Sequence, residues 1–192
     1  KKILVRLNPY ADLIADWEKF YRDLGINCDL SDVRIPDDPG GFGRVIIMTQ
    51  GITPQSAYDL CAKFFTCWRW IDRSLDEVID FSFQNRSAKN HTYAIRIRDR
   101  IEADEELKNL SASQLKSMGI PGIALEERFI YELKYFKETG KHLDIKYITL
   151  CAGSRVGDDI VPLVYRREGK ITVFIAGILE ACYEFRARAV VS

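Results

Sequence analysis

The sequence predicts an α+β fold in two parts, because strand and helix patterns are both frequent but follow a different order in each half. Strands and helices alternate in residues 1–71, which indicates a small α/β accessory unit over residues 1–85. A strand and two helices precede an unbroken run of strands in the second half, which indicates a separate domain over residues 90–192. The polar, aperiodic stretch SFQNRSAKN, residues 82–90, is the expected link.

The accessory unit opens with a strand and a helix. KKILVRL, residues 1–7, is an apolar strand pattern that ends at Asn8. Apolar side chains then recur at helical spacing until Gly25, which is a typical helix stop. The shared helical face consists of Leu13, Trp17, Phe20 and Leu24.

A second strand and helix follow a turn-rich stretch. RVIIMT, residues 44–49, is an apolar strand pattern. Thr53 supplies an N-cap and Pro54 a first-turn proline for the next helix. WRWI, residues 68–71, is the expected third strand.

The second half begins with TYAIRIRD, residues 92–99, which alternates like a half-buried strand. EADEELKNL, residues 102–110, predicts a short acidic helix. Ser111 and Gln114 have the spacing of a capping box for a further helical turn, which Gly119 ends.

The strongest helix pattern is ALEERFIYELKYFKETG, residues 124–140, with Gly140 as its stop. Its apolar stripe consists of Leu125, Phe129, Leu133 and Phe136. Only strand patterns follow, and they are KYITLCAG (146–153), PLVYR (162–166), KITVFI (170–175) and FRARAVV (185–191).

Composition excludes several classes of function. With 47% hydrophobic residues the chain can bury a core, and equal numbers of basic and acidic residues, 28 each, give no reason to expect a nucleic-acid partner. The apolar run ITVFIAGILEACY, residues 171–183, is shorter than the roughly 20 residues of a membrane span. Residues 1–7 lack a signal-peptide pattern because Arg6 interrupts them, so we expect a cytoplasmic protein without a membrane partner.

Motifs for catalysis, cofactors or metals are almost absent. The cysteines contain no C-x-x-C pair and indicate neither a zinc site nor a disulfide framework; they are Cys28, Cys61, Cys67, Cys151 and Cys182. We therefore assign no catalytic, cofactor or metal residues and expect a non-enzymatic protein. The alternative is a metal-dependent hydrolase or nuclease, in which Asp99, Glu102 and Asp104 act together with Arg96, Arg98 and Arg155.

Residues 90–192 resemble the variable proteins that are diversified by retroelements. The resemblance lies in the order of elements and in the segments TLCAGSR, VYR, ITVFI and FRARAVVS. Several of those proteins have a C-type-lectin-like fold. The resemblance implies that residues 165–183 carry the diversified positions, that FRARAVVS is a fixed closing strand, and that TYAIRIRD pairs with it. The calcium-binding motifs of sugar-binding lectins are absent, so neither Ca²⁺ nor carbohydrate is expected.

On this basis we expect a ligand-binding protein whose partner is another protein. In the strand 170–175 the face of Ile171 should be core and the face of Phe174 exposed, and residues 176–183 should form an apolar loop. The candidate ligand-binding residues are Tyr165, Thr172, Phe174, Ala176, Ile178, Leu179, Cys182 and Tyr183. A third hypothesis is an assembly protein in which the apolar C-terminal segment is a homo-oligomer interface.

Overall fold

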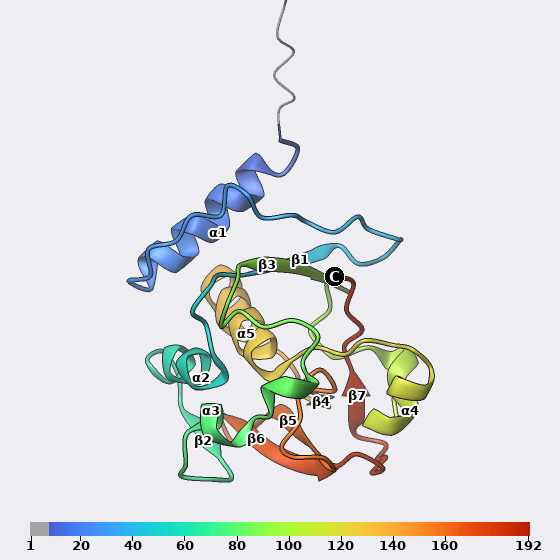
Figure 1. Cartoon of the computed structure of the whole chain (residues 1–192). Helices are drawn as coiled ribbons and strands as arrows, with labels where there is room; N and C mark the ends of the chain where they lie inside the picture. The colour runs from blue at the N-terminus through green and yellow to red at the C-terminus, as the bar shows by residue number, and fades with distance from the viewer. Residues whose placement is uncertain (1–7) are drawn as a thin grey trace, which may run out of the picture.

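A central helix, α5 (Leu125–Thr139), lies between two sheets in the computed structural model of the chain (Figure 1). On one side is the antiparallel pair of β1 (Arg44–Met48) and β3 (Tyr93–Ile97), and α1 (Ala11–Asp23) lies beyond this pair. The structure describes residues 8–192, so the strand expected at residues 1–7 lies outside the described part.

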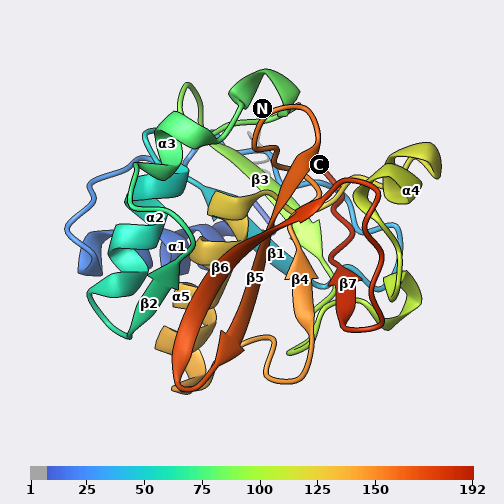
Figure 2. The ribbon, with the colours of Figure 1, turned by 90° about the horizontal axis from the view of Figure 1, so that it is seen from below.

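The larger sheet lies on the other side of α5, and its five strands run in the order β2-β6-β5-β4-β7 (Figure 2). The long hairpin of β5 and β6 turns at Glu168 and Gly169, which both have positive φ, 51° and 76°. β2 joins β6 in parallel, and β7 joins β4 in parallel. The bounds are β2 (Cys67–Arg69), β4 (Ile148–Leu150), β5 (Ile160–Arg167), β6 (Lys170–Gly177) and β7 (Phe185–Ala187).

The remaining helices surround this core. Both predicted N-caps are confirmed: Thr53 and Ser111 each accept the backbone N–H of the third helical residue and form capping boxes. They begin α2 (Pro54–Ala62) and α4 (Ala112–Ser117). Three short elements complete the chain, namely α3 (Leu75–Val78) and the 3₁₀ turns η1 (Phe81–Phe83) and η2 (Glu105–Leu107).

The acidic helix predicted for residues 102–110 is wrong, because only the single turn η2 forms there. Two of its carboxylates are used elsewhere. Glu102 accepts hydrogen bonds from the backbone of residues 145–147, and Asp104 accepts one from the amide of Ala189. These long-range bonds hold the segment in an extended path on either side of the turn.

One hydrophobic core crosses the boundary that was expected at residues 82–90. It contains Trp17 and Ile47 from the first half together with Phe129 and Val173 from the second. The sheets cross the same boundary, since β1 pairs with β3 and β2 pairs with β6. The mixed α+β class is confirmed, and the larger hydrophobic core is built from residues of both halves.

The closing segment meets β3 through a single antiparallel bridge. Arg96 and Val191 exchange both backbone hydrogen bonds, at 2.8 and 2.9 Å. The strand β7 itself pairs with β4, so the expected contact between TYAIRIRD and FRARAVV is limited to this bridge and does not merge the two sheets. Between β7 and this bridge, the amide of Val190 donates to the carbonyl of Pro121.

Candidate functional site

Successive residues of β6 face two different environments. Ile171 and Val173 are fully buried in the core shared with α5. Phe174, which points to the opposite face of the sheet, is 44% exposed. This outer face is on the near side of β5 and β6 in Figure 2, with α5 behind them. The predicted assignment of the Ile171 face to the core therefore holds for Ile171 and Val173.

An aromatic surface, which we define as Trp68, Tyr165 and Phe174, occupies the open end of the outer face. The Trp68 and Phe174 rings stack with their centroids 6.4 Å apart and their planes 22° apart, and Trp68 is 45% exposed. Thr172 lies between Trp68 and Tyr165 in the strand register. The guanidinium carbon of Arg167 lies 5.3 Å from the Tyr165 ring centroid, so a cation borders the aromatic surface.

The other end of the outer face is covered by a second hydrophobic core. Leu115 of α4 and Leu107 of η2 pack there against Val161 and Leu163 of β5. Ile178 and Cys182, from the loop after β6, pack partly against the same cluster. The loop is fixed by its backbone, because the amide of Ile178 donates to Asp159 and its carbonyl accepts from Ser113.

Two of the candidate ligand-binding residues are corrected by the structure. β6 continues to Gly177, so Ala176 belongs to the strand and not to the loop, and it packs into the second core with only 5% of its surface exposed. Thr172 is 8% exposed because its neighbours in β2 and β5 cover it. Neither side chain is displayed on the surface.

The other six candidates retain some exposure. Leu179 and Tyr183 are the most exposed, at 77% and 76%, and both lie in the loop after β6. Tyr165, Ile178 and Cys182 are half-buried, like much of the sheet around them. Trp68 was missed, because nothing in CWR indicates that this short strand joins β6 from a distant part of the chain.

The acidic cluster of the metal-dependent alternative does not assemble as a ligand set. Asp104 is 1% exposed and pairs with Arg98 at 2.7 Å, while Glu102 is occupied by the three amides of residues 145–147. Arg155 bonds the carbonyls of Ala152 and Ser154 instead of joining the cluster. Within residues 8–192 no group of three or more His, Cys, Asp or Glu side chains is placed to hold a metal ion.

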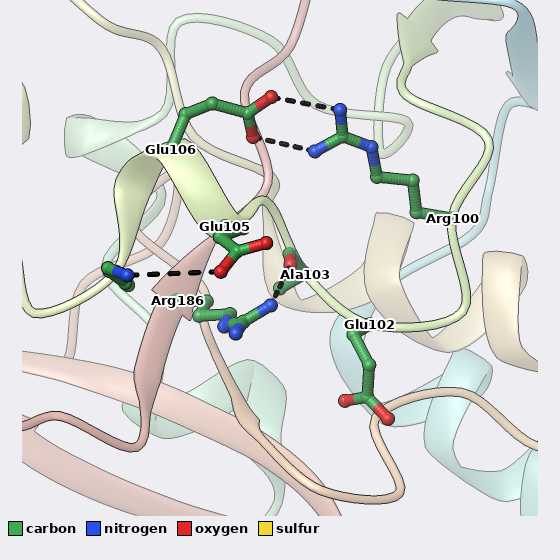
Figure 3. A pocket seen from close by; sticks show the side chains of 7 residues that line it. Arg100, Glu102, Ala103, Glu105, Glu106 and Arg186 are labelled. Carbon is green, nitrogen blue, oxygen red and sulfur yellow. Dashed lines mark hydrogen bonds and ion pairs between the residues drawn. The ribbon is translucent and has the colours of Figure 1, made fainter.

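A cavity of about 710 Å³ next to η2 contains further acidic residues, but they are balanced by basic ones (Figure 3). Glu106 forms two bonds to Arg100, at 2.6 and 2.9 Å, and Glu105 lies 3.8 Å from the Lys108 ammonium. The Arg100 pair lowers the pKa of Glu106 to about 2. Glu106 is therefore the ionised partner of Arg100, and its lowered pKa is the opposite of what a general acid needs.

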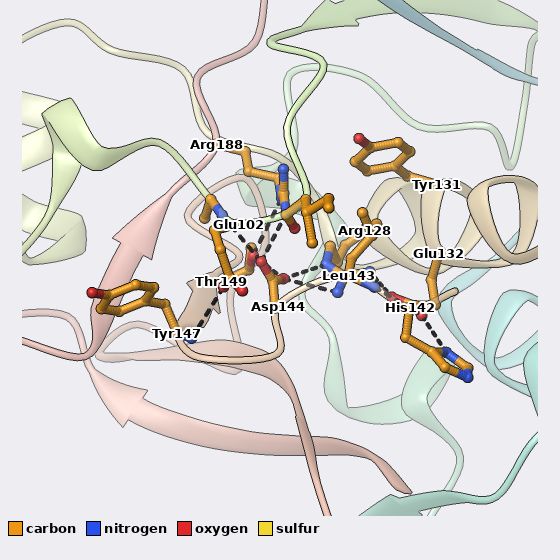
Figure 4. Close-up of polar contacts among 12 residues, drawn as sticks. Glu102, Arg128, Tyr131, Glu132, His142, Leu143, Asp144, Tyr147, Thr149 and Arg188 are labelled. Carbon is orange, nitrogen blue, oxygen red and sulfur yellow. Dashed lines mark hydrogen bonds and ion pairs between the residues drawn. The ribbon is translucent and has the colours of Figure 1, made fainter. Parts of the chain in front are cut away.

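The largest group of buried charges lies between α5 and β7 and is centred on Asp144 (Figure 4). Its carboxylate accepts hydrogen bonds from Arg128 at 2.9 Å and from Arg188 at 2.7 Å, and also from the Thr149 hydroxyl. Burial opposes the charge of Asp144, but Arg188 and Arg128 outweigh it and lower the pKa of its carboxyl.

Arg128 extends this Asp144 network along α5. It donates to Glu132 at 2.7 Å, and Glu132 in turn contacts His142 Nδ1 at 2.8 Å. Arg128, Glu132 and Asp144 are completely buried. The network connects α5, the 144–149 segment and the closing strand, so its role is structural.

A second buried acidic pair lies at the start of α5. Glu127 accepts hydrogen bonds from Arg86 at 2.6 and 2.8 Å and from the Tyr93 hydroxyl at 2.8 Å. Glu126 has no such cation, and burial, with the adjacent Glu127 charge, raises the pKa of Glu126 to about 8. Glu126 is thus a neutral acid at physiological pH, enclosed by the protein.

Comparison with protein-family models, with curated proteins and with solved structures finds no match to this chain. Within residues 8–192, no helix combines the length and apolar character that crossing a membrane requires. The site therefore has to be interpreted from its own geometry.

Proposed function

We propose that this chain is a non-enzymatic ligand-binding protein that holds a protein ligand against the aromatic surface and the apolar loop 178–183. The observation that carries the proposal is the stacked pair of Trp68 and Phe174, two large apolar side chains that remain nearly half exposed. Exposed aromatic groups of this kind are typical of interaction surfaces, in which Trp and Tyr supply much of the binding energy.

The scaffold beneath the aromatic surface favours this function. Ile171 and Val173 anchor β6 in the core, so Phe174, the next residue along the strand, is held in place by a rigid strand. A rigid surface loses little conformational entropy on binding. The surface is open and not a closed pocket, which suits a protein better than a small molecule.

We further propose that the protein is of the retroelement-diversified, C-type-lectin-like kind. The order β3, α4, α5 and β4–β7, with the bridge between Arg96 and Val191 bringing the two ends together, supports this proposal. Phe174, Leu179 and Tyr183 lie in the segment that the resemblance makes variable, and all three are exposed.

Binding can be tested with a peptide library displayed on phage and selected against the purified protein. We expect enriched peptides to lose at least about tenfold in affinity against Trp68→Ala and Phe174→Ala, as for interface anchors. Phe64→Ala is a matched control, because Phe64 is an aromatic side chain that is 39% exposed and lies outside the aromatic surface and the loop 178–183. Peptides that bind all of these variants equally would contradict the proposal.

The diversification can be tested separately in the genome. We expect a near-copy of the DNA that encodes residues 160–192, differing chiefly at adenines and adjacent to a reverse-transcriptase gene. Without such a copy the retroelement proposal fails, whereas the binding proposal still depends on the peptide experiment. Self-association through Leu179 and Tyr183, measured by light scattering, would instead favour an assembly protein.

A further inference from the structure

A second cavity, of about 360 Å³, lies between η1, α4 and the segments 120–122 and 152–155. Three basic side chains line it, those of Arg86, Lys116 and Arg155, and no acidic residue does. We propose that this basic cavity binds a small anion, namely a phosphate or carboxylate group carried on an apolar body. This inference is independent of the proposed function, because none of the residues of the aromatic surface lines the cavity.

Arg155 is the best-placed group for the anion. Its Nη1 donates to the carbonyls of Ala152 and Ser154, at 2.9 and 2.8 Å, which fixes the orientation of the guanidinium. Its Nε and Nη2 have no acceptor within residues 8–192, so they are free to donate to a ligand. Burial lowers the pKa of Arg155, as expected for a half-buried cation that no carboxylate neutralises.

The net charge of the basic cavity is positive. Glu127 neutralises Arg86 through two hydrogen bonds, whereas neither Lys116 nor Arg155 forms a salt bridge with any residue of the described part. The nearby Glu126 compensates for them only in part, because its raised pKa of about 8 keeps it mostly protonated at neutral pH. The cavity next to η2 differs in this respect, since its acidic side chains offset its basic ones.

The basic cavity also has a rigid backbone wall and some apolar lining side chains. Gly153 approaches Gly122 so closely that a Cβ on Gly153 would lie 2.5 Å from the Gly122 carbonyl oxygen. Leu115 is buried beneath the cavity, and Phe83 is exposed at its edge. Arginine and lysine therefore face one end of a ligand while apolar side chains face the rest, and the volume is within the range of small-molecule sites.

The shared chemistry of the proposed ligands is a compact anionic group, and simple aromatic probes distinguish its possible sources. Phenyl phosphate and benzoate carry the two anions, benzylamine carries the opposite charge on a similar ring, and inorganic phosphate lacks the apolar body. Titrations of the full chain are followed by calorimetry and by the shift in melting temperature.

We expect phenyl phosphate or benzoate to bind with a dissociation constant below about 1 mM, inorganic phosphate more weakly, and benzylamine not at all. The double substitution Arg155→Gln and Lys116→Gln should weaken binding at least about tenfold. The matched control, Lys63→Gln with Arg73→Gln, removes two exposed positive charges that do not line the basic cavity, and should leave the affinity unchanged.

Three results would overturn the inference. They are the absence of binding by every anion up to about 10 mM, equal binding of benzylamine, or an affinity that the double substitution does not change. If the double variant does not fold, Lys116→Gln alone, at an exposed position, must still reduce the affinity by about threefold. Phe174→Ala should retain anion binding, so a failure of the anion-binding inference can be distinguished from a failure of the proposed protein-binding function.

Discussion

The two faces of the five-stranded sheet differ in the side chains that they bury and expose. The inner face and α5 enclose the Asp144 network, in which Arg128, Glu132 and Asp144 are fully buried. The open end of the outer face instead carries Trp68 and Phe174, which are apolar and nearly half exposed. A cluster of paired charges is thus buried on one side of the sheet, and two aromatic rings are partly exposed on the other.

The difference indicates which residues serve the fold and which are available for binding. Every carboxylate of the Asp144 network is matched by a cation within 2.9 Å, so its charges are satisfied and inaccessible to a ligand. In the aromatic surface Trp68 and Phe174 stack on each other and stay nearly half exposed, and Arg167 lies beside the Tyr165 ring. A ligand could therefore bury additional area on the outer face but not on the inner one.

The largest effect on the free energy of unfolding is expected from Asp144→Ala, which disrupts the buried Asp144 network. This substitution leaves Arg128 and Arg188 buried without their shared carboxylate, which should reduce the free energy of unfolding by about 3–5 kcal/mol. Urea denaturation measures the change. Asp158→Ala, at an exposed acidic position, is the control, and a loss of less than about 1 kcal/mol in Asp144→Ala would contradict a structural role.

The second effect concerns pH and the buried carboxyl of Glu126. Its pKa is raised from 4.5 to about 8 in the folded protein, so the unfolded chain releases this proton first as the pH rises. The contribution of Glu126 to the free energy of unfolding is fully present below about pH 4.5. It is lost as the pH rises to about 8, with a slope approaching 1.4 kcal/mol per pH unit.

Glu126→Gln should remove that part of the pH dependence, because an amide does not ionise. Chemical denaturation of both proteins between pH 5 and 8 measures the difference in slope. Glu77→Gln, at an exposed position, should leave the slope unchanged. Parallel curves for the wild type and Glu126→Gln would show that Glu126 titrates normally in the folded protein.

The smallest effect comes from adjacent residues on opposite faces of β6. Val173→Ala removes two buried methyl groups and should lower the free energy of unfolding by about 2 kcal/mol. Phe174→Ala, one residue further, removes a larger side chain but should lower it by about 1 kcal/mol or less, because the ring is partly solvated. If Phe174→Ala proves the more destabilising in thermal unfolding, the aromatic surface is part of the core and the contrast between the faces fails.

Local patterns predicted much of the secondary structure. The apolar stripe of α5, the stop at Gly140 with φ of 68°, the N-cap at Thr53 and the capping box at Ser111 were all predicted from residues within one or two helical turns. The strands β1 and β5 were predicted from their apolar runs in the same way. The physical reason is that periodicity and capping depend on neighbours in the chain.

The sequence by itself therefore determined the mixed α+β class, most helix boundaries and the core face of β6 at Ile171 and Val173. The tertiary structure decided that the two halves share one core, that Trp68 stacks on Phe174, and that Glu102 and Asp104 bond distant backbone amides. These contacts join residues separated by 43 to 106 positions in the chain. No local pattern encodes them, because they depend on which strands pair and on which buried charges must find partners once water is excluded.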